Sequence, residues 1–387
     1  MILFRVFSMF LFLLAVHRAA AYPTYISYGY HSCMSCHFDP LGNGPLTDYG
    51  RSVSATELTD RRFWSSGIRG DDEKIAGLSG FFFGKPPVDW LRPSASYRGL
   101  AYQTNPGQAG GKTRWITMDA SAALVAKFLT DDRLIFVGQL SYAPQPLAEQ
   151  GSGRAYANYR SRDLYAGFRF TKSFGIYAGL MDKAFGIRVP DHIAFSRTIT
   201  RNTQDDQTEA LLLHYLSSTF EMALQPFIGN PVQEGNLRQK GVASQVGVLV
   251  ADTTRLGASA LVSSSDAMKI SMYALDIRSG FDRGNSLMLE AGQVDLSPTD
   301  GTKSSNRYVF LQNQWLLNQG LSALMTAEFL QPDINQDAQT YRFGPGIQYF
   351  PIYRVELRLD VYDTRTHSSL AYADDTWFIT GQVHLWF

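Results

Sequence analysis

Apolar and polar residues alternate one by one along much of the chain, most clearly in RVELRLDVY at residues 354–362. Every odd-numbered position of this stretch is aliphatic and every even-numbered position is charged or polar. A period of two places the two kinds of side chain on opposite faces of a β-strand. Weaker versions of the pattern occur at 134–142, 242–250 and 321–329. The pattern therefore predicts strands, and helical periodicity is nearly absent.

Alternating segments recur from about residue 75 to residue 387, separated by turn residues such as those at 130–132, 298–301 and 318–320. We count about 16 candidate strands, and closed bacterial barrels take an even number. The predicted fold is all-β, a transmembrane antiparallel β-barrel of about 16 strands. A soluble β-sandwich or propeller is the alternative for the same pattern.

Three features favour a barrel in the outer membrane. The polar face of residues 354–360 carries charges of both signs, as a water-filled lumen would. Aromatic residues gather near strand ends, as in membrane-interface girdles, for example Tyr341, Phe343, Tyr349 and Phe350. The chain ends on WFITGQVHLWF at 377–387, which resembles the C-terminal signal of bacterial outer-membrane barrels and has Ile379, Val383, Leu385 and Phe387 on one face.

Composition and the N-terminal sequence indicate the cellular compartment of the protein. Lys and Arg number 35 against 35 Asp and Glu, so the basic footprint of a nucleic-acid-binding protein is missing. Residues 1–21 combine Arg5, a short apolar core and a final run of three alanines, which predicts a secretory signal peptide cut before Tyr22. An uncleaved membrane anchor is the alternative, but the apolar core is short of the ~20 residues that a spanning helix needs.

Residues 22–74 precede the first predicted strand and contain both cysteines of the chain, in CMSCH at 33–37. A disulfide between Cys33 and Cys36 would close a very short loop and constrain little of the unfolded chain. A thioredoxin-like pair would need a βαβ context. Structural zinc normally uses two well-separated ligand pairs, whereas Cys36 and His37 are adjacent.

The remaining interpretation is a covalent c-type haem. Two thiols form thioethers to the vinyl groups, and the adjacent His37 reaches the iron from one face. The predicted organisation is a signal peptide (1–21), a haem-binding segment (22–74) that is either a periplasmic appendage or a plug in the lumen, and a barrel (75–387). The segment is too short for a core of the usual domain size, so we expect it to lean on the barrel.

A family resemblance follows from these motifs together. SCMSCHFDPLGNGPLTDYGR at 32–51, the C-terminal signal and, more weakly, FGIRVPDHIAFSR at 185–197 resemble haem-carrying outer-membrane barrels related to porin–cytochrome electron conduits. The resemblance implies electron transfer. Better-known conduits thread a multihaem cytochrome through a separate barrel, whereas this chain has one haem motif.

The second axial ligand is open. His192, next to Asp191 in a long break between predicted strands, is the preferred candidate because a loop can fold inward and Asp191 can orient the ring. His31 lies too close to Cys33 to wrap easily to the opposite haem face. The other candidates are an empty sixth site, His214, His384 and methionines such as Met181.

Nearby residues are candidates for the haem surroundings. Arg51, Arg61 and Arg62 can neutralise haem propionates by forked hydrogen bonds, or simply solvate a loop. Aromatic rings can pack on the macrocycle or stiffen the entry to the barrel; the candidates are Tyr25, Tyr28 and Tyr30.

Three functions are compatible with these features. The leading hypothesis is an outer-membrane monohaem cytochrome fused to a porin-like barrel, which exchanges electrons with periplasmic or extracellular cytochromes. The alternative is a passive porin or structural barrel whose haem segment acts as a plug. A peroxidase would need an acid-base histidine on the distal face, so we expect no enzyme. Outer-membrane lipid is an expected partner, nucleic acid is not, and a homo-oligomer stays open.

Overall fold

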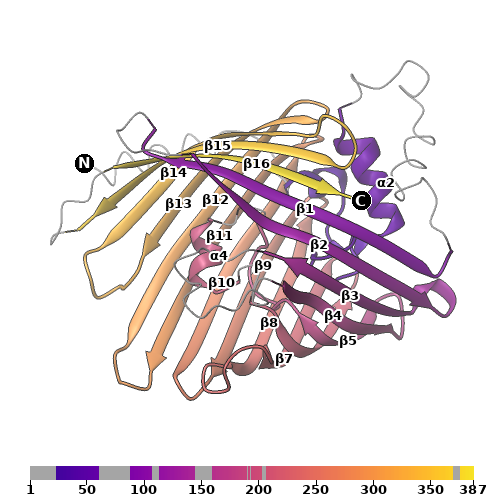
Figure 1. Cartoon of the computed structure of the whole chain (residues 1–387), viewed down its shortest axis with the longest axis horizontal. Helices are drawn as coiled ribbons and strands as arrows, with labels where there is room; N and C mark the ends of the chain where they lie inside the picture. The colour runs from indigo at the N-terminus through magenta and orange to yellow at the C-terminus, as the bar shows by residue number, and fades with distance from the viewer. Residues whose placement is uncertain are drawn as a thin grey trace.

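The computed structural model describes residues 23–60, 88–106, 113–143, 159–189, 191, 193–202, 206–368 and 375–387. In this part of the chain, sixteen antiparallel strands form one closed barrel, with each strand paired to its neighbours in sequence (Figure 1). Pairing of β1 with β16, from Ser96↔Trp386 to Thr104↔Phe378, closes it. The predicted fold class and strand number are confirmed.

The strands are β1 (Leu91–Thr104), β2 (Arg114–Phe128), β3 (Leu134–Tyr142), β4 (Tyr159–Arg169), β5 (Phe174–Met181), β6 (Thr208–Leu216), β7 (Phe220–Gly229), β8 (Lys240–Ala251), β9 (Thr254–Ser264), β10 (Met268–Phe281), β11 (Asn285–Pro298), β12 (Ser304–Asn318), β13 (Leu321–Gln331), β14 (Gln339–Tyr349), β15 (Val355–His367) and β16 (Thr376–Trp386). The described helical turns are η1 (Pro23–Tyr28), η2 (Cys33–Ser35), α2 (Asp48–Val53), η3 (Ser54–Leu58), η4 (Thr130–Asp132) and α4 (Phe195–Ile199).

The barrel has its polar side inside and its apolar side outside. In β15 the side chains of Glu356 and Arg358 are 2% and 5% exposed, whereas Leu357 and Leu359 between them are 41% and 49% exposed. Exposed aliphatic rows on a closed barrel suit a lipid surround, where every strand hydrogen bond must be made within the protein. Among the described helices, none is long and apolar enough to cross a bilayer.

Aromatic residues lie where the sequence predicted a girdle, with two exceptions. Tyr341 and Phe343 face outwards, 44% and 38% exposed. The hydroxyl of Tyr349 instead donates a hydrogen bond to the carboxylate of Asp60, in the N-terminal part of the chain, at 3.1 Å. Phe350 is buried, and its ring centroid lies 6.3 Å from that of Trp386. Phe350 therefore belongs to the interior, because it continues the inward-facing row of even-numbered residues of β14, such as Arg342 and Gln348.

Residues 23–60, here called the inner segment, contact the inward side chains and the short turns of the barrel. Gly284, in the β10–β11 turn, donates to Ser27 Oγ at 2.9 Å. Gln319, in the β12–β13 turn, donates to Thr56 O at 2.8 Å. Arg92 of β1 forms a forked pair with the carboxylate of Asp48, at 2.8 Å for both of its donor nitrogens. Figure 1 shows α2 of this segment at the end of the barrel where the C-terminus lies. These contacts tie residues 23–60 to the barrel, and the choice between a periplasmic appendage and a plug stays a prediction.

The described part of the connection between β5 and β6, residues 182–189, 191, 193–202 and 206–207, also enters the barrel, and we call it the inward loop. Ala184 N–H donates to Gln225 Oε1 at 2.7 Å, and Phe195 N–H to Glu328 Oε1 at 2.7 Å. Tyr362 donates to Asp191 at 2.7 Å. These partners lie on β7, β13 and β15, so the loop spans the lumen, with α4 inside the barrel (Figure 1).

One side of the lumen is an apolar core rather than a wet surface. The inner segment contributes Phe38 and the inward loop contributes Phe185 to the same buried cluster. The wall contributes small and aliphatic side chains from several strands, for example Val125, Val137 and Leu212. The expectation of a polar lumen therefore holds for β15 but not for this side, where the wall packs against the chain inside it.

The predicted signal peptide and the boundary at residue 74 lie outside the described residues, and the first strand begins at Leu91.

Outward-facing strand residues should tolerate charge poorly. Leu359→Arg should lower the free energy of unfolding from lipid vesicles by ~2–4 kcal/mol, because arginine near the bilayer midplane costs about that much. Val232→Arg, in the β7–β8 connection and 84% exposed, is the matched control and should change the free energy by less than ~0.5 kcal/mol. Equal effects of the two substitutions in denaturant titrations would contradict the outward assignment of Leu359.

Candidate haem site in the lumen

The CMSCH motif forms a tight turn in which two N–H groups donate to one backbone carbonyl, that of Cys33. Ser32 caps η2, and its side chain accepts from Met34 N–H at 3.4 Å. The N–H groups of Cys36 and His37 both donate to Cys33 O, at 3.1 and 2.9 Å. This tight turn holds the two thiols and the imidazole on one short piece of backbone.

The following loop folds back on the motif. Phe38 N–H donates to the carbonyl oxygen of Pro45 at 3.2 Å, and His37 forms an isolated antiparallel bridge with Leu46. Gly42, with a φ of +86°, passes close to Cys33: a Cβ at this glycine would lie 2.8 Å from the Cys33 sulfur. Only glycine adopts this backbone freely and leaves room for the sulfur.

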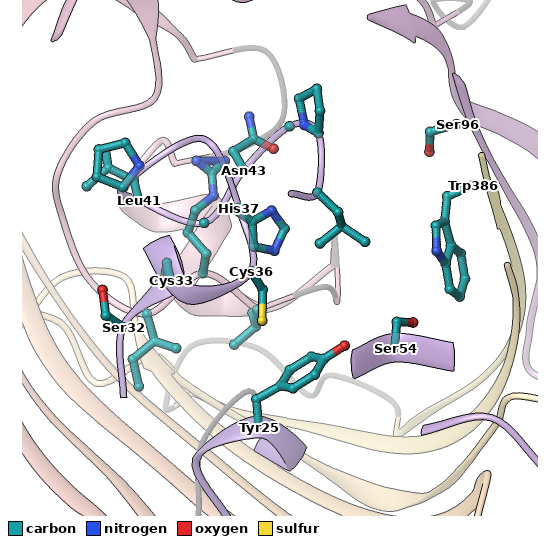
Figure 2. Close-up of a pocket in the computed structure, with 18 of the residues that line it drawn as sticks. Tyr25, Ser32, Cys33, Cys36, His37, Leu41, Asn43, Ser54, Ser96 and Trp386 are labelled. Atoms are coloured by element: carbon teal, nitrogen blue, oxygen red, sulfur yellow. The ribbon is translucent and has the colours of Figure 1, made fainter. Parts of the chain in front are cut away.

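A cavity of about 430 Å³ lies between the inner segment, the inward loop and the barrel wall. Cys33, Cys36 and His37 all line it, and both cysteines are free thiols. Figure 2 shows the His37 ring and the Cys36 sulfur on the same side of the cavity, with Ser96 and Trp386 on the other. The volume is within the range of small-molecule and cofactor sites. The predicted motif thus faces a space of ligand size.

Burial sets the protonation state of the three groups. It lowers the pKa of His37 to about 4, against a smaller opposing effect of the backbone at Gly44 and Asn43. At neutral pH the imidazole is therefore neutral and keeps a lone pair for a metal ion. Burial also raises the pKa of Cys33, and raises that of Cys36 to about 11, so both are thiols rather than thiolates.

The cavity is rich in arginine. Seven arginines line it against three acidic side chains. The arginines are Arg51, Arg98, Arg162, Arg188, Arg197, Arg255 and Arg278, and the acids are Asp119, Glu221 and Glu356. Four of these arginines already pair with carboxylates: Arg162 with Asp119, Arg188 with Asp182, Arg255 with Glu221 and Arg278 with Asp276. The others, such as Arg51, are better placed to receive an anionic ligand, since arginine recognises carboxylates with paired hydrogen bonds.

Arg51, expected near the haem propionates, is at the cavity. It is 4% exposed, and its guanidinium donates to Leu46 O at 3.5 Å and to Pro93 O at 3.4 Å. Burial lowers its pKa to about 10, so it stays charged at neutral pH. Arg61 and Arg62, the other two candidates, lie outside the described residues.

Three further histidines, His31, His214 and His384, line the same cavity. His192, the preferred second ligand in the sequence, lies outside the described residues, so that prediction stays a prediction. Its neighbour Asp191 accepts from Ile193 N–H at 3.0 Å and from Tyr362. Met181 belongs to the buried apolar cluster and not to the cavity lining.

The wall of the cavity contains residues that sequence reasoning did not connect to the site. Ser96, Arg98 and Glu356 lie on β1 and β15, far from the motif in sequence. The register between β1 and β2 shifts at Arg98, and such bulges redirect side chains. The alternation does place Glu356 on the inner face, but it does not identify its neighbours.

The residues fit a covalent haem: two free thiols and a neutral imidazole share one wall of a cavity of suitable size, with arginines around it. In the described part of the chain no cluster of three or more His, Cys, Asp or Glu residues could hold a bare metal ion.

Comparison with known proteins identifies the architecture. No family model matches the sequence, and no curated protein matches it either. Among solved structures, OmpT, an outer-membrane protein of Vibrio cholerae, is 10% identical with a TM-score of 0.57, covering 77% of this chain and 97% of that chain. An anion-selective porin from Comamonas acidovorans is 8% identical with a TM-score of 0.57, covering 77% of this chain and 99% of that chain.

OmpF of Salmonella typhi, in complex with daunomycin, is 13% identical with a TM-score of 0.55, covering 77% of this chain and 97% of that chain. At such identities the likeness shows the fold alone. The chain has the fold of outer-membrane β-barrel porins, and the predicted outer-membrane location agrees with it. The expectation that the chain is no enzyme rests on the sequence; DcaP of Acinetobacter baumannii, described as an outer membrane channel, is a further solved structure with this fold.

The close approach of Gly42 to Cys33 can be tested with a matched pair. Gly42→Ala should loosen the inner segment more than Gly29→Ala, because both have φ near +90° but only Gly42 has an atom of another residue within 4 Å of the added Cβ. The backbone cost of about 1–2 kcal/mol is common to both. Limited proteolysis within residues 23–60 of the folded barrel measures the difference, and equal cleavage rates would mean that the Cys33 contact is unimportant.

Proposed function

We propose that the chain is an outer-membrane barrel carrying one covalent haem c in its lumen, and that it transfers electrons between a periplasmic partner and a partner at the outer surface. The observation that carries the proposal is the placement of Cys33, Cys36 and His37 on one wall of one cavity. A haem bound there would supply one-electron oxidation and reduction of its iron. The other residues that line the cavity would hold and surround the haem.

Each residue type has a physical role in this proposal. Cys33 and Cys36 would hold the macrocycle covalently, and the neutral His37 would supply the first axial nitrogen. The arginines would balance the propionates, with Arg51 on the same segment as the motif. Apolar side chains such as Leu46 and Met288 limit the access of water to the cavity, and a drier surrounding tunes the potential of an iron centre.

The position of the inner segment along the barrel axis supports a redox partner in the periplasm. The inner segment bonds to the short turns at 282–284 and 319–320, and in bacterial outer-membrane barrels the short turns are periplasmic. Tyr49 of this segment is 54% exposed and gives a partner access to the same end. The apolar band of such a barrel is ~25 Å tall, so one haem reaches the far surface only with a second redox centre from a partner.

A passive porin with a plug is the second candidate, and the fold neighbours favour it more directly than they favour electron transfer, since one of them is described as an anion-selective porin. The contents of the lumen argue against free passage of solutes, which is expected both of a plugged barrel and of a haem carrier. Phe38 and Phe185 join the wall in one buried cluster, and the inward loop spans the barrel. A pore filled in this way leaves little room for solutes.

Covalent haem is the first test. Protein expressed in a host with c-type maturation should give one haem per chain in a pyridine-haemochrome assay. Cys33→Ser combined with Cys36→Ser should give none, while Ser35→Ala, within the same motif, should keep full incorporation. Purified outer membranes should contain the folded barrel in all three cases. A wild-type chain without haem would end the electron-transfer proposal and leave the porin.

Solute flux separates the two candidates. Liposomes containing the wild-type protein should swell slowly in small sugars, with a rate at least tenfold below that of liposomes with an open porin of the same fold. Charged solutes of either sign should behave alike. Rapid swelling with wild-type protein would favour the passive porin, even if haem is present.

A further inference from the structure

His384 stands out among the histidines of the cavity because of its place on the closing strand. It lies on the inner face of β16, and its ring centroid is 5.1 Å from that of Trp386. Its Nε2 lies 3.1 Å from Ser96 Oγ across the β1–β16 seam. Figure 2 shows Ser96 and Trp386 on the side of the cavity that faces His37. His384 is therefore on the wall opposite the CMSCH motif.

The other ring nitrogen of His384 contacts a carboxylate. Nδ1 lies 3.1 Å from Glu356 Oε2, and Glu356 is 2% exposed and fixed by Gln348, which donates to its other oxygen at 2.6 Å. Histidines that ligate metals almost always donate their second ring N–H to such a partner. With a proton on Nδ1, Nε2 accepts a hydrogen bond from Ser96 Oγ at 3.1 Å, and a ligand at Nε2 would displace only this hydroxyl.

Arg98 completes this arrangement. Its Nη2 is 3.1 Å from Nδ1 of His384. One nitrogen cannot both donate to Glu356 and accept from Arg98, so with Nδ1 protonated the guanidinium acts as a charge beside the carboxylate. The pair Arg98 and Glu356 is then close to neutral, and the imidazole can stay neutral between them.

The two other histidines of the cavity are less suited. Nε2 of His214 is bound to Glu221 Oε1 at 2.9 Å, and the same carboxylate pairs with Arg255 and accepts from Ser32 at 2.9 Å. The hydrogen bond from His214 to Glu221 would have to break before Nε2 of His214 could bind a haem iron, and this would disturb the ion pair of Glu221 with Arg255. His31 is two residues from Cys33, which keeps it on the same side as the thiols.

We propose that His384 is the second axial ligand of the haem, with Glu356 as the residue that positions its ring. The inference rests on the proposed function, and it assigns to a residue of the barrel wall the role that we predicted for His192. It also means that the haem would be bound by both the inner segment and the last strand. Six-coordination of the iron, though not covalent attachment of the haem, would then require a closed barrel.

The test compares holoproteins with one histidine changed. Wild-type protein should show a low-spin, six-coordinate spectrum that does not react with carbon monoxide when reduced. His384→Ala should keep covalent haem, become predominantly high-spin and bind carbon monoxide. His214→Ala and His192→Ala are the matched controls and should stay low-spin. Migration of the unheated protein in gels checks that each barrel is folded.

Two conservative changes separate ligation from packing. His384→Met should restore a low-spin iron with a more positive midpoint potential than wild type, since methionine ligation raises the potential relative to histidine. Glu356→Gln should stay low-spin but also shift the potential upwards, because the weaker acceptor makes the imidazole a poorer donor. A merely structural role of Glu356 would leave the potential unchanged.

The outcomes are distinct from those for the proposed function. A low-spin spectrum in His384→Ala, with haem retained, would overturn the assignment and leave the electron-transfer proposal standing. If His192→Ala alone becomes high-spin, the inward loop supplies the ligand instead. A high-spin wild type would also overturn the assignment, and absence of covalent haem from wild type would remove the proposed function itself.

Discussion

The structure depends on one constraint: backbone N–H and C=O groups of a chain in lipid must find partners within the protein. Sixteen strands satisfy it only when β1 pairs with β16, which joins residues that are far apart in sequence, such as Ser96 and Trp386. Closure creates an inside, and the period of two along each strand then decides which side chains enter it. The cavity and its arginines are consequences of this closure.

The inner segment depends on the barrel for a hydrophobic core. A segment of residues 23–60 has too little surface to bury for a core of its own. Phe38 therefore shares a core with wall residues such as Val137, and Asp48 and Thr56 bond to β1 and to a turn. The CMSCH motif is positioned by contacts that the barrel provides.

Much of the fold could be predicted from the sequence, because alternation is a local signal. The segment 134–142 became β3 with the same ends, and 321–329 became most of β13. Cys33, Cys36 and His37, which the motif singled out, line the cavity, and their role as haem residues stays a prediction. The gathering of aromatic residues near a strand end was a weaker signal: Phe350 was assigned to the membrane interface, but it continues the inner row of β14 and is buried against Trp386. The relation of His384 to Ser96 and Glu356 depends on closure and register, which no single segment contains.

The same contacts bear on whether the lumen can conduct solutes and hold a redox group at once. A porin keeps an aqueous path, and water along that path would raise the dielectric around any group bound there. Here the inner segment and the inward loop fill the lumen from two sides and meet the wall through apolar side chains as well as ion pairs. Such packing narrows the path open to solutes, whereas the cavity itself is lined by arginine, histidine and carboxylate side chains. The architecture of a porin is thus compatible with a function that requires the pore to be closed.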